Sequence, residues 1–194
     1  MSNASIIFND VSFNYAAACN PLITNLSIHL PLGWTGIVGP NGAGKTTLLQ
    51  LATGVLHPSD GQISAPSNTL YCPQRSDNIP EQFSELSQAM DSNAFKIRGR
   101  LAINIDWLER WDSLSFGERK RAQIAVALWL EPHVLAIDEP TNHLDTAARD
   151  LLAEALQAFT GVGLLVSHDR ELLDNLCCQC LFMDPPEAVL RPGG

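Results

Sequence analysis

Long apolar runs are missing from this chain. The most apolar stretch, from Ala122 to Ile137, is interrupted by Glu131 and Pro132 and is too short to cross a bilayer. The N-terminus has no basic segment followed by an apolar one, so no secretory signal is expected. If the protein acts at a membrane, we expect another chain to supply the membrane part.

Basic residues are also few. The 12 Lys and Arg residues stand against 21 Asp and Glu residues, which gives a net charge of −9. This balance argues against a general affinity for nucleic acid or anionic membranes. The basic residues are unevenly placed, however, and seven of the 12 lie between Lys96 and Arg121. That cluster is either a solvated helical face, which the acids among it favour, or a patch that binds a partner.

Cysteine is sparse, and its odd count does not suggest a disulfide framework. The five cysteines are Cys19, Cys72, Cys177, Cys178 and Cys180. We expect them to be reduced thiols in a cytoplasmic protein. With 194 residues, of which 45% are hydrophobic, the chain is long enough for one domain with a sizeable core.

One segment carries glycines at fixed positions before a lysine. The run Gly39-Pro40-Asn41-Gly42-Ala43-Gly44-Lys45-Thr46-Thr47 matches the P-loop pattern G-x-x-x-x-G-K-[ST]. In such a loop the backbone N–H groups surround phosphate oxygens, the lysine adds a positive charge, and the threonine hydroxyl can ligate Mg²⁺. A predicted strand precedes the loop, and a predicted helix follows it whose N-terminus favours an anion. The segment therefore predicts a nucleotide site.

Strands alternate with helices along most of the chain. We predict strands over residues 5–8, 11–13, 26–30, 34–38, 62–64, 69–72, 134–137, 163–167 and 181–183. We predict helices over residues 46–54, 81–90, 94–111, 116–129, 146–159 and 170–176. This order predicts an α/β fold in which helices flank the sheet. Residues 185–194, rich in Pro and Gly, are expected to be a chain end or the start of a linker.

Two acids directly follow an apolar predicted strand. Asp138 and Glu139 come after Val134-Leu135-Ala136-Ile137, a run typical of a strand buried on both faces. From the carboxyl end of such a strand, Asp138 can hold Mg²⁺ through water, and Glu139 can orient and deprotonate an attacking water. A pair of solvated loop acids is the alternative, which the apolar run and the P-loop disfavour.

A Ser/Gly element lies at the predicted start of another helix. In Leu114-Ser115-Phe116-Gly117-Glu118, the serine hydroxyl and the following N–H groups could bind a phosphate at the helix N-terminus. An ordinary helix cap would explain the same residues.

Together these motifs resemble those of an ABC-type ATPase domain, in the same order and over nearly the whole chain. The resemblance equates residues 39–46 with Walker A, Gln74 with the Q-loop glutamine, 114–118 with the signature motif, 134–139 with Walker B, 142–145 with the D-loop, and His168 with the switch histidine. It implies one domain over residues 1–194 with a P-loop NTPase (RecA-like) core and a mainly parallel sheet. An N-terminal antiparallel β subdomain and a small helical subdomain, about residues 77–128, would complete it.

The resemblance also implies roles around bound ATP and Mg²⁺. Gly39, Asn41 to Thr47 and Gln74 would bind the nucleotide, and Tyr15 would stack on adenine unless it is a core tyrosine. Thr46, Gln74 and Asp138 would surround the Mg²⁺ ion. Lys45, Glu139 and His168 would be the catalytic residues, with His168 bonded to the γ-phosphate and the glutamate.

The family's ATP sites are composite, which implies a second ABC domain as partner. Ser115 and Gly117 would contact the γ-phosphate that the other domain binds. Phe116 departs from the commonest signature, which has glycine there. We expect the phosphate contact to survive with altered packing.

Two segments resemble one class of the family more closely. Glu139-Pro140-Thr141-Asn142-His143-Leu144-Asp145 and Ser167-His168-Asp169-Arg170 resemble the ABC-F class, whose members carry two ABC domains and act on ribosomes in translation or antibiotic resistance. The short segment between Gln74 and Ser115 fits a protein that does not grip membrane helices. Since this chain holds one ABC domain, we expect it to be the N-terminal part of a longer ABC-F protein. The alternative is the ATP-binding subunit of a transporter whose permease is a separate chain.

Overall fold

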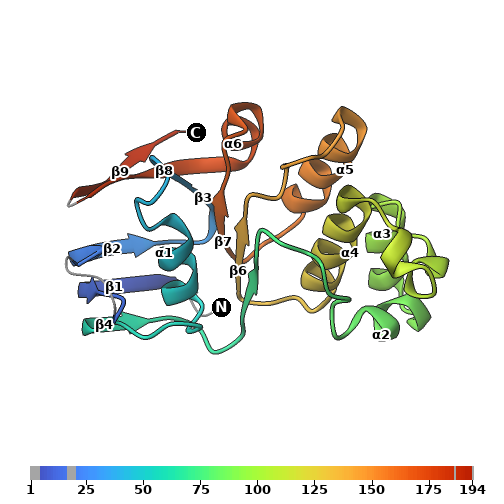
Figure 1. Ribbon diagram of the computed structural model, residues 1–194, viewed down its shortest axis with the longest axis horizontal. Coiled ribbons are helices and arrows are strands. Elements are labelled where there is room, and N and C mark those ends of the chain that lie inside the picture. Colours follow the sequence, from blue (N-terminus) through green and yellow to red (C-terminus); the bar gives the residue numbers. More distant parts are fainter. Residues whose placement is uncertain (1–4, 17–20, 186, 194) are drawn as a thin grey trace.

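The computed structural model describes residues 5–16, 21–185 and 187–193. Its strands form a three-stranded sheet of order β2-β1-β4 and a six-stranded sheet of order β5-β6-β7-β3-β8-β9. The strands are β1 (Ile6–Phe13), β2 (Ile23–Leu30), β3 (Gly33–Val38), β4 (Asp60–Ser64), β5 (Thr69–Cys72), β6 (Val134–Asp138), β7 (Val162–Val166), β8 (Cys177–Asp184) and β9 (Glu187–Pro192). The helices are α1 (Lys45–Ala52), α2 (Phe83–Gln88), α3 (Ser92–Arg100), η1 (Ile105–Leu108), η2 (Trp111–Ser113), α4 (Phe116–Trp129), α5 (Thr146–Gln157) and α6 (Arg170–Leu176) (Figure 1).

The larger sheet is parallel except at one edge. Strands β5, β6, β7, β3 and β8 pair in parallel, and β9 pairs antiparallel to β8. The smaller sheet is antiparallel throughout. The antiparallel sheet lies at one end of the molecule and helices α2 to α4 at the other, with the parallel sheet between them (Figure 1). This arrangement confirms the predicted P-loop NTPase fold class.

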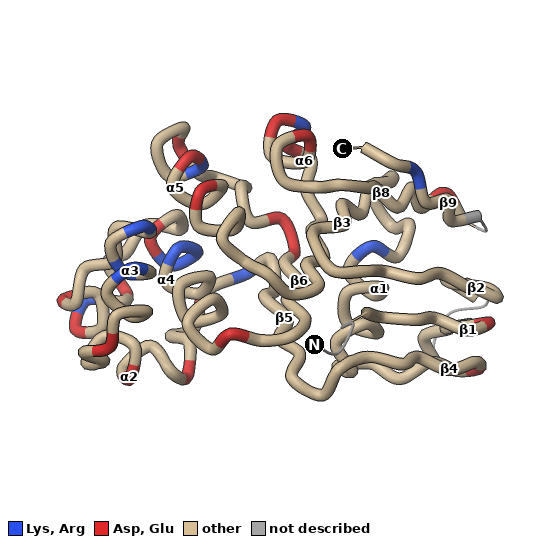
Figure 2. The backbone as a smooth tube through the Cα atoms, turned by 180° about the vertical axis from the view of Figure 1, so that it is seen from behind, with Lys and Arg blue, Asp and Glu red and all other residues tan. Residues whose placement is uncertain are grey.

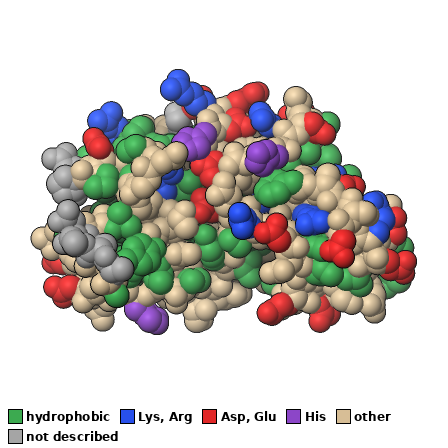
Figure 3. Space-filling view, in the orientation of Figure 1, with side chains coloured by type: hydrophobic (Ala, Val, Ile, Leu, Met, Phe, Trp, Pro, Cys, Tyr) green, Lys and Arg blue, Asp and Glu red, His purple; other side chains and the backbone are tan. Residues whose placement is uncertain are grey.

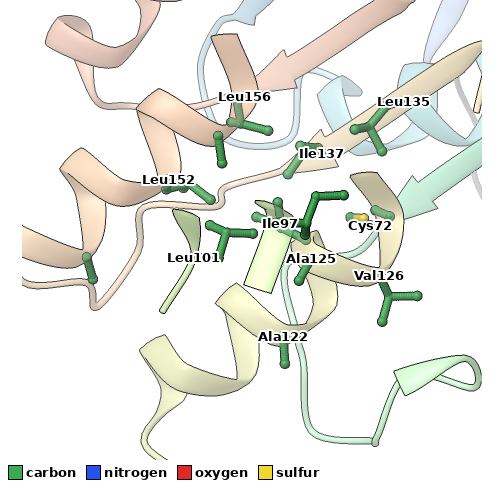
Figure 4. Close-up of a cluster of buried hydrophobic side chains, with 14 of the residues drawn as sticks. Cys72, Ile97, Leu101, Ala122, Ala125, Val126, Leu135, Ile137, Leu152 and Leu156 are labelled. Atoms are coloured by element: carbon green, nitrogen blue, oxygen red, sulfur yellow. The ribbon is translucent and has the colours of Figure 1, made fainter. Parts of the chain in front are cut away.

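Strand β6 shows why the central strands are apolar throughout. Leu135 and Ile137 pack into one hydrophobic cluster, together with side chains of α4 and α5 (Figure 4). The alternate residues Val134 and Ala136 pack into a second cluster on the other face, with side chains of α1 and of the antiparallel sheet. Both faces of the strand are therefore covered, as is typical of parallel sheets.

The order of the parallel strands places four loops at one edge of the sheet. Strand β7 lies between β3 and β6, and β5 lies beside β6. Because parallel strands end at the same edge, the loops after β3, β7, β6 and β5 leave the sheet side by side. The P-loop, His168, the Asp138–Glu139 pair and Gln74 belong to these loops.

Trp34 of β3 ties the sheet to α5. Its ring is buried, and its indole Nε1 donates a hydrogen bond to the Leu156 carbonyl oxygen at 3.1 Å. The ring lies against Gly163 of β7, where an added Cβ would come within 2.3 Å of it. Only glycine leaves room for the tryptophan at this position.

The predicted helix over residues 94–111 is correct only as far as residue 100. Helix α3 ends at Arg100, and Ala102 takes a left-handed backbone with φ of 47°. The Ala102 amide donates to the Gly99 carbonyl at 3.2 Å and the Ile103 amide to the Arg98 carbonyl at 2.8 Å. This pair of bonds is a Schellman motif, which terminates helices. The apolar residues beyond it reach the core from the short 3₁₀ turns η1 and η2 instead.

Other predicted segments also differ from the structure. The predicted strands 5–8 and 11–13 are one strand, β1, whose pairing register shifts around Asp10, a residue with φ of 48°. Strand β8 begins at Cys177, four residues before the predicted start at Leu181. Within residues 185–194, where we expect a chain end or the start of a linker, Glu187–Pro192 form β9, which extends the sheet.

The described part of the chain contains no helix that is long and apolar enough to span a membrane. Cys72, Cys177 and Cys180 are buried free thiols, and Cys178 is an exposed one. Cys19 lies outside the described residues.

Candidate functional site

A cavity of about 540 Å³ opens where the loops after β3, β5, β6 and β7 meet. Its lining residues are Leu22, Asn41, Gly42, Gly44, Lys45, Thr46, Thr47, Gln74, Asp138, Glu139, Asn142, Val166 and His168. Acidic side chains lie near the centre of the face that Figure 3 shows, between the part of the molecule that holds the sheets and the part that holds helices α2 to α4. The fold thus brings the P-loop, both acids, Gln74 and His168 to one site.

The P-loop curls around the ammonium group of Lys45. Lys45 Nζ donates to the carbonyl oxygens of Gly39 at 2.8 Å and Pro40 at 3.0 Å. Gly39 has a positive φ, and a Cβ there would lie 2.2 Å from the Met183 carbonyl oxygen, so only glycine lets the loop pass β8 this closely. Gly44 precedes α1 and gives it no side-chain cap, which leaves the first N–H groups of α1 free for a ligand.

Thr46 and Asp138 meet on the floor of the cavity. The Thr46 hydroxyl donates to Asp138 Oδ2 at 2.6 Å, and the Tyr71 hydroxyl donates to the same oxygen at 3.4 Å. Burial, with the nearby Asp138 charge, raises the pKa of Tyr71, so its hydroxyl stays protonated and a donor. Hydroxyl and carboxylate oxygens are the ligands that Mg²⁺ prefers, so this donor set fits the ion.

Glu139 is held in an unusual backbone conformation beside this pair. Its φ is 46°, and its amide donates to the Val166 carbonyl oxygen at 2.9 Å. Its Oε1 lies 3.2 Å from His168 Nε2, whereas its Oε2 is buried and has no hydrogen-bond partner among the described residues. Burial raises the pKa of the Glu139 carboxyl, and the neighbouring His168 opposes that rise. A strained, desolvated carboxylate of this kind is typical of functional sites.

Tyr15 lies at the rim of the P-loop rather than among the residues that line the cavity. Its hydroxyl is 3.0 Å from Thr47 Oγ1, and its ring packs edge-on against Phe13 at 4.9 Å between centroids. The side chain is 44% exposed, so one part of the ring remains open to a ligand.

Some functional neighbours were missed at the sequence level. Asn142 and Leu22 line the cavity, and Tyr71 bonds to Asp138. The sequence predicts Asn142 as part of the D-loop but not of the ATP site, although it lies three residues after Glu139 in the same loop. Tyr71 offers no such signal, since it reaches the site through the pairing of β5 with β6, and no local pattern marks Leu22, which directly precedes β2.

Ser115 and Gly117 do not line this cavity. The Ser115 hydroxyl accepts a hydrogen bond from the Glu118 amide at 3.2 Å, and Glu118 Oε2 accepts one from the Ser115 amide at 2.8 Å. This capping box begins α4 at an exposed serine. The next residue, Phe116, packs edge-on against His143 of the D-loop at 5.3 Å between centroids.

The basic segment is largely engaged within the protein. Arg98, Arg119 and Arg121 stack on the rings of Phe95, Trp111 and Trp107, respectively. Arg98 also donates to the carbonyl oxygens of Leu86 and Ser87. Acidic residues lie among the basic ones over α2 to α4 (Figure 2). The expected solvated face therefore describes only some of these basic residues. Several of the others support the packing of the helical region.

The chain is similar to several known proteins. A family model described as "ABC transporter" matches residues 23–142. ATP-binding cassette sub-family F member 2 of Mus musculus is 35% identical over 201 residues, which cover 97% of this chain and 32% of that protein. ABC transporter F family member 4 of Arabidopsis thaliana is 34% identical over 188 residues, covering 88% of this chain and 26% of that protein. The chain thus spans about a third or less of these curated relatives.

Two further comparisons concern proteins closer to this chain in length. A protein of Nitratidesulfovibrio vulgaris, named for an ABC transporter ATP-binding role, is 27% identical over 212 residues, covering 94% of this chain and 77% of that protein. A solved dimeric ATP-binding cassette, in a post-hydrolysis state with ADP and Pi bound, superposes with a TM-score of 0.79 at 18% identity. That match covers 96% of this chain and 98% of the other, and it shows a shared fold.

Proposed function

This chain belongs to the ABC transporter family of ATP-binding domains, and on that premise we propose that it binds and hydrolyses ATP in the cavity at the carboxyl edge of its parallel sheet. The observation that carries the proposal is the buried Glu139 carboxylate, whose Oε2 has no partner among the described residues and which lies beside the Thr46–Asp138 pair. A site that only bound a nucleotide would have no use for such a group.

The P-loop holds the phosphates in this proposal. Lys45 and the backbone N–H groups between Asn41 and Thr47 contact the phosphate oxygens, and Tyr15 stacks on the adenine ring. Thr46, Gln74 and Asp138 supply the oxygens that hold Mg²⁺, directly or through water. The bound ion would neutralise negative charge that builds up on the phosphates during transfer.

Glu139 then acts as the general base. Its free Oε2 can accept the proton of a water that attacks the γ-phosphate, and its raised pKa improves the match to a general base working near neutral pH. His168, 3.2 Å from Oε1, orients the carboxylate and donates to the γ-phosphate. The side chain of His168 is 63% exposed, so the ring can turn toward a ligand at the cavity mouth.

The site is completed by a second ABC domain. Ser115 and Gly117 do not line the cavity of their own chain, and from the start of α4, where Ser115 is exposed, they can contact the γ-phosphate held by another domain. The partner is a second domain of the same polypeptide or a second copy of this chain. ATP at the shared surface closes the pair and hydrolysis opens it.

For the wider role, we infer an ABC-F protein that acts on the ribosome, in translation or antibiotic resistance. Relatives named for sub-family F, about three times the length of this chain, support the assignment to the ABC-F class. A transporter subunit with a separate permease is the second candidate, favoured by the Nitratidesulfovibrio vulgaris protein of similar length. The complete gene separates the two: a second ABC domain downstream supports the first, and an adjacent permease gene supports the second.

Nucleotide binding is tested with Lys45→Ala. The variant should lose affinity for a fluorescent ATP analogue in a titration, because the cation that contacts the phosphates is gone. Lys96→Ala is the matched control, because Lys96 is an exposed lysine of α3. This variant should bind the ATP analogue as tightly as the wild type does. Micromolar affinity retained by Lys45→Ala would overturn the P-loop assignment.

A further inference from the structure

Lys120 of α4 is a fully buried lysine, with 0% of its surface exposed. Lysine is rarely buried unless its charge is paired, and Lys120 makes no ion pair among the described residues. Its Nζ instead donates to the Pro73 carbonyl oxygen at 2.7 Å and to Gln123 Oε1 at 2.9 Å. Burial lowers the pKa of its ammonium to about 8. An apolar residue would fill this core position without that cost, so the amine has some other use.

The partner of Lys120 lies next to a residue of the nucleotide site. Pro73 directly precedes Gln74, which lines the cavity. On the other side of Gln74, the Arg75 carbonyl oxygen accepts a hydrogen bond from Gln123 Nε2 at 3.5 Å. Lys120 and Gln123 lie on one face of α4, three residues apart. The two carbonyl groups that flank Gln74 are thus held by a single helix.

The same helix begins at Ser115, which caps its N-terminus. A rigid α4 therefore joins two parts of the catalytic machinery that belong to different composite sites. One is Gln74, which lines the cavity of this chain. The other is Ser115, which in the proposed function contacts the γ-phosphate in the cavity of the partner domain.

We propose that Lys120 is a positioning residue: through the Pro73 carbonyl it fixes Gln74 relative to α4, so that Mg²⁺–ATP at Gln74 and the placement of Ser115 are set together. The inference rests on the proposed function, in which Gln74 helps to hold Mg²⁺. A purely structural lysine would affect stability, and it would alter nucleotide affinity equally with and without the metal ion.

The test is a titration of the full chain with a fluorescent ATP analogue, with Mg²⁺ and with EDTA. The proteins compared are the wild type, Gln74→Ala, Lys120→Met and the double variant. Lys120→Met should lower the gain in affinity that Mg²⁺ provides by about fivefold, the equivalent of one hydrogen bond. The double variant should gain no less affinity from Mg²⁺ than Gln74→Ala alone, because Lys120 acts on the metal site only through Gln74.

Two results would overturn the inference: an equal effect of Lys120→Met with Mg²⁺ and with EDTA, or an undiminished effect in the Gln74→Ala background. Should Lys120→Met unfold, as judged by circular dichroism, Lys120→Gln takes its place under the same criteria. Its shorter amide keeps a donor, so a smaller loss of the Mg²⁺ gain is expected from it. If Gln74→Ala itself leaves the Mg²⁺ gain of the wild type intact, the proposed role of Gln74 fails. If Gln74→Ala removes that gain and Lys120→Met does not, only the inference about Lys120 fails.

Discussion

Replacing Glu139 by glutamine removes the proposed general base while keeping the size of the side chain. The amide cannot accept a proton from water at the position of Oε2, which is buried and free of partners among the described residues. General-base catalysis contributes about 10²- to 10⁴-fold, so turnover should fall by at least about 100-fold. ATP affinity should not fall, because the phosphate-binding loop is untouched. The variant should therefore accumulate as an ATP-bound dimer, because ATP binds but is not hydrolysed.

The assay measures phosphate release per chain at saturating ATP and Mg²⁺, together with ATP affinity and the size of the complex by gel filtration. Glu154→Gln is the matched control, because Glu154 is an exposed acid on α5 outside the cavity. It should turn over ATP at the wild-type rate. Turnover by Glu139→Gln within about threefold of wild type would refute the reasoning, since it would leave no room for a general-base contribution of the usual size.

Three other outcomes are expected. Thr46→Val should retain ATP binding in EDTA but lose most of the gain from Mg²⁺ in a fluorescence titration; an intact gain would remove Thr46 from the metal site. Because burial raises the folded-state pKa of Glu139, its charge costs stability at neutral pH, and this cost fades as the pH falls through that pKa. Glu139→Gln should therefore raise the free energy of unfolding at neutral pH, by an amount that shrinks on acidification; a pH-independent difference in denaturant titrations would contradict this. Gly163→Ala should lower the free energy of unfolding by about 1–3 kcal/mol through its clash with Trp34, whereas Gly99→Ala, where a Cβ meets open space, should not; equal melting curves for the two would argue against the packing described.

The motifs of the site were visible in the sequence, and the family resemblance predicted that they meet at one site, but their spacing alone did not. The local pattern of residues 39–47 indicates phosphate binding, and that of the Asp138–Glu139 pair indicates metal chemistry. Nothing in their spacing says that the loops after β5 and β7 lie on either side of Glu139. That follows from the strand order β5-β6-β7-β3, which long-range pairing decides.

Other features depend on contacts that periodicity does not report. The apolar spacing between residues 94 and 111 favours one helix, yet backbone hydrogen bonds around Ala102 end it early. Lys120, within a stretch of charged residues, looks like part of a solvated face. It is buried because the loop around Pro73 crosses over α4, a contact between residues far apart in the chain.

The composite site, which needs Ser115 from a second domain, is tested most directly by mixing two defective chains. Lys45→Ala keeps its signature but cannot bind ATP, and Ser115→Arg binds ATP but blocks its own signature. Each alone should be nearly inactive in phosphate release at chain concentrations that saturate the wild-type rate. Mixed equally, they should recover about a quarter of the wild-type rate, since half of the pairs are mixed and each has one intact site. A Ser115→Arg chain as active as the wild type, or a mixture no more active than its parts, would contradict the composite site.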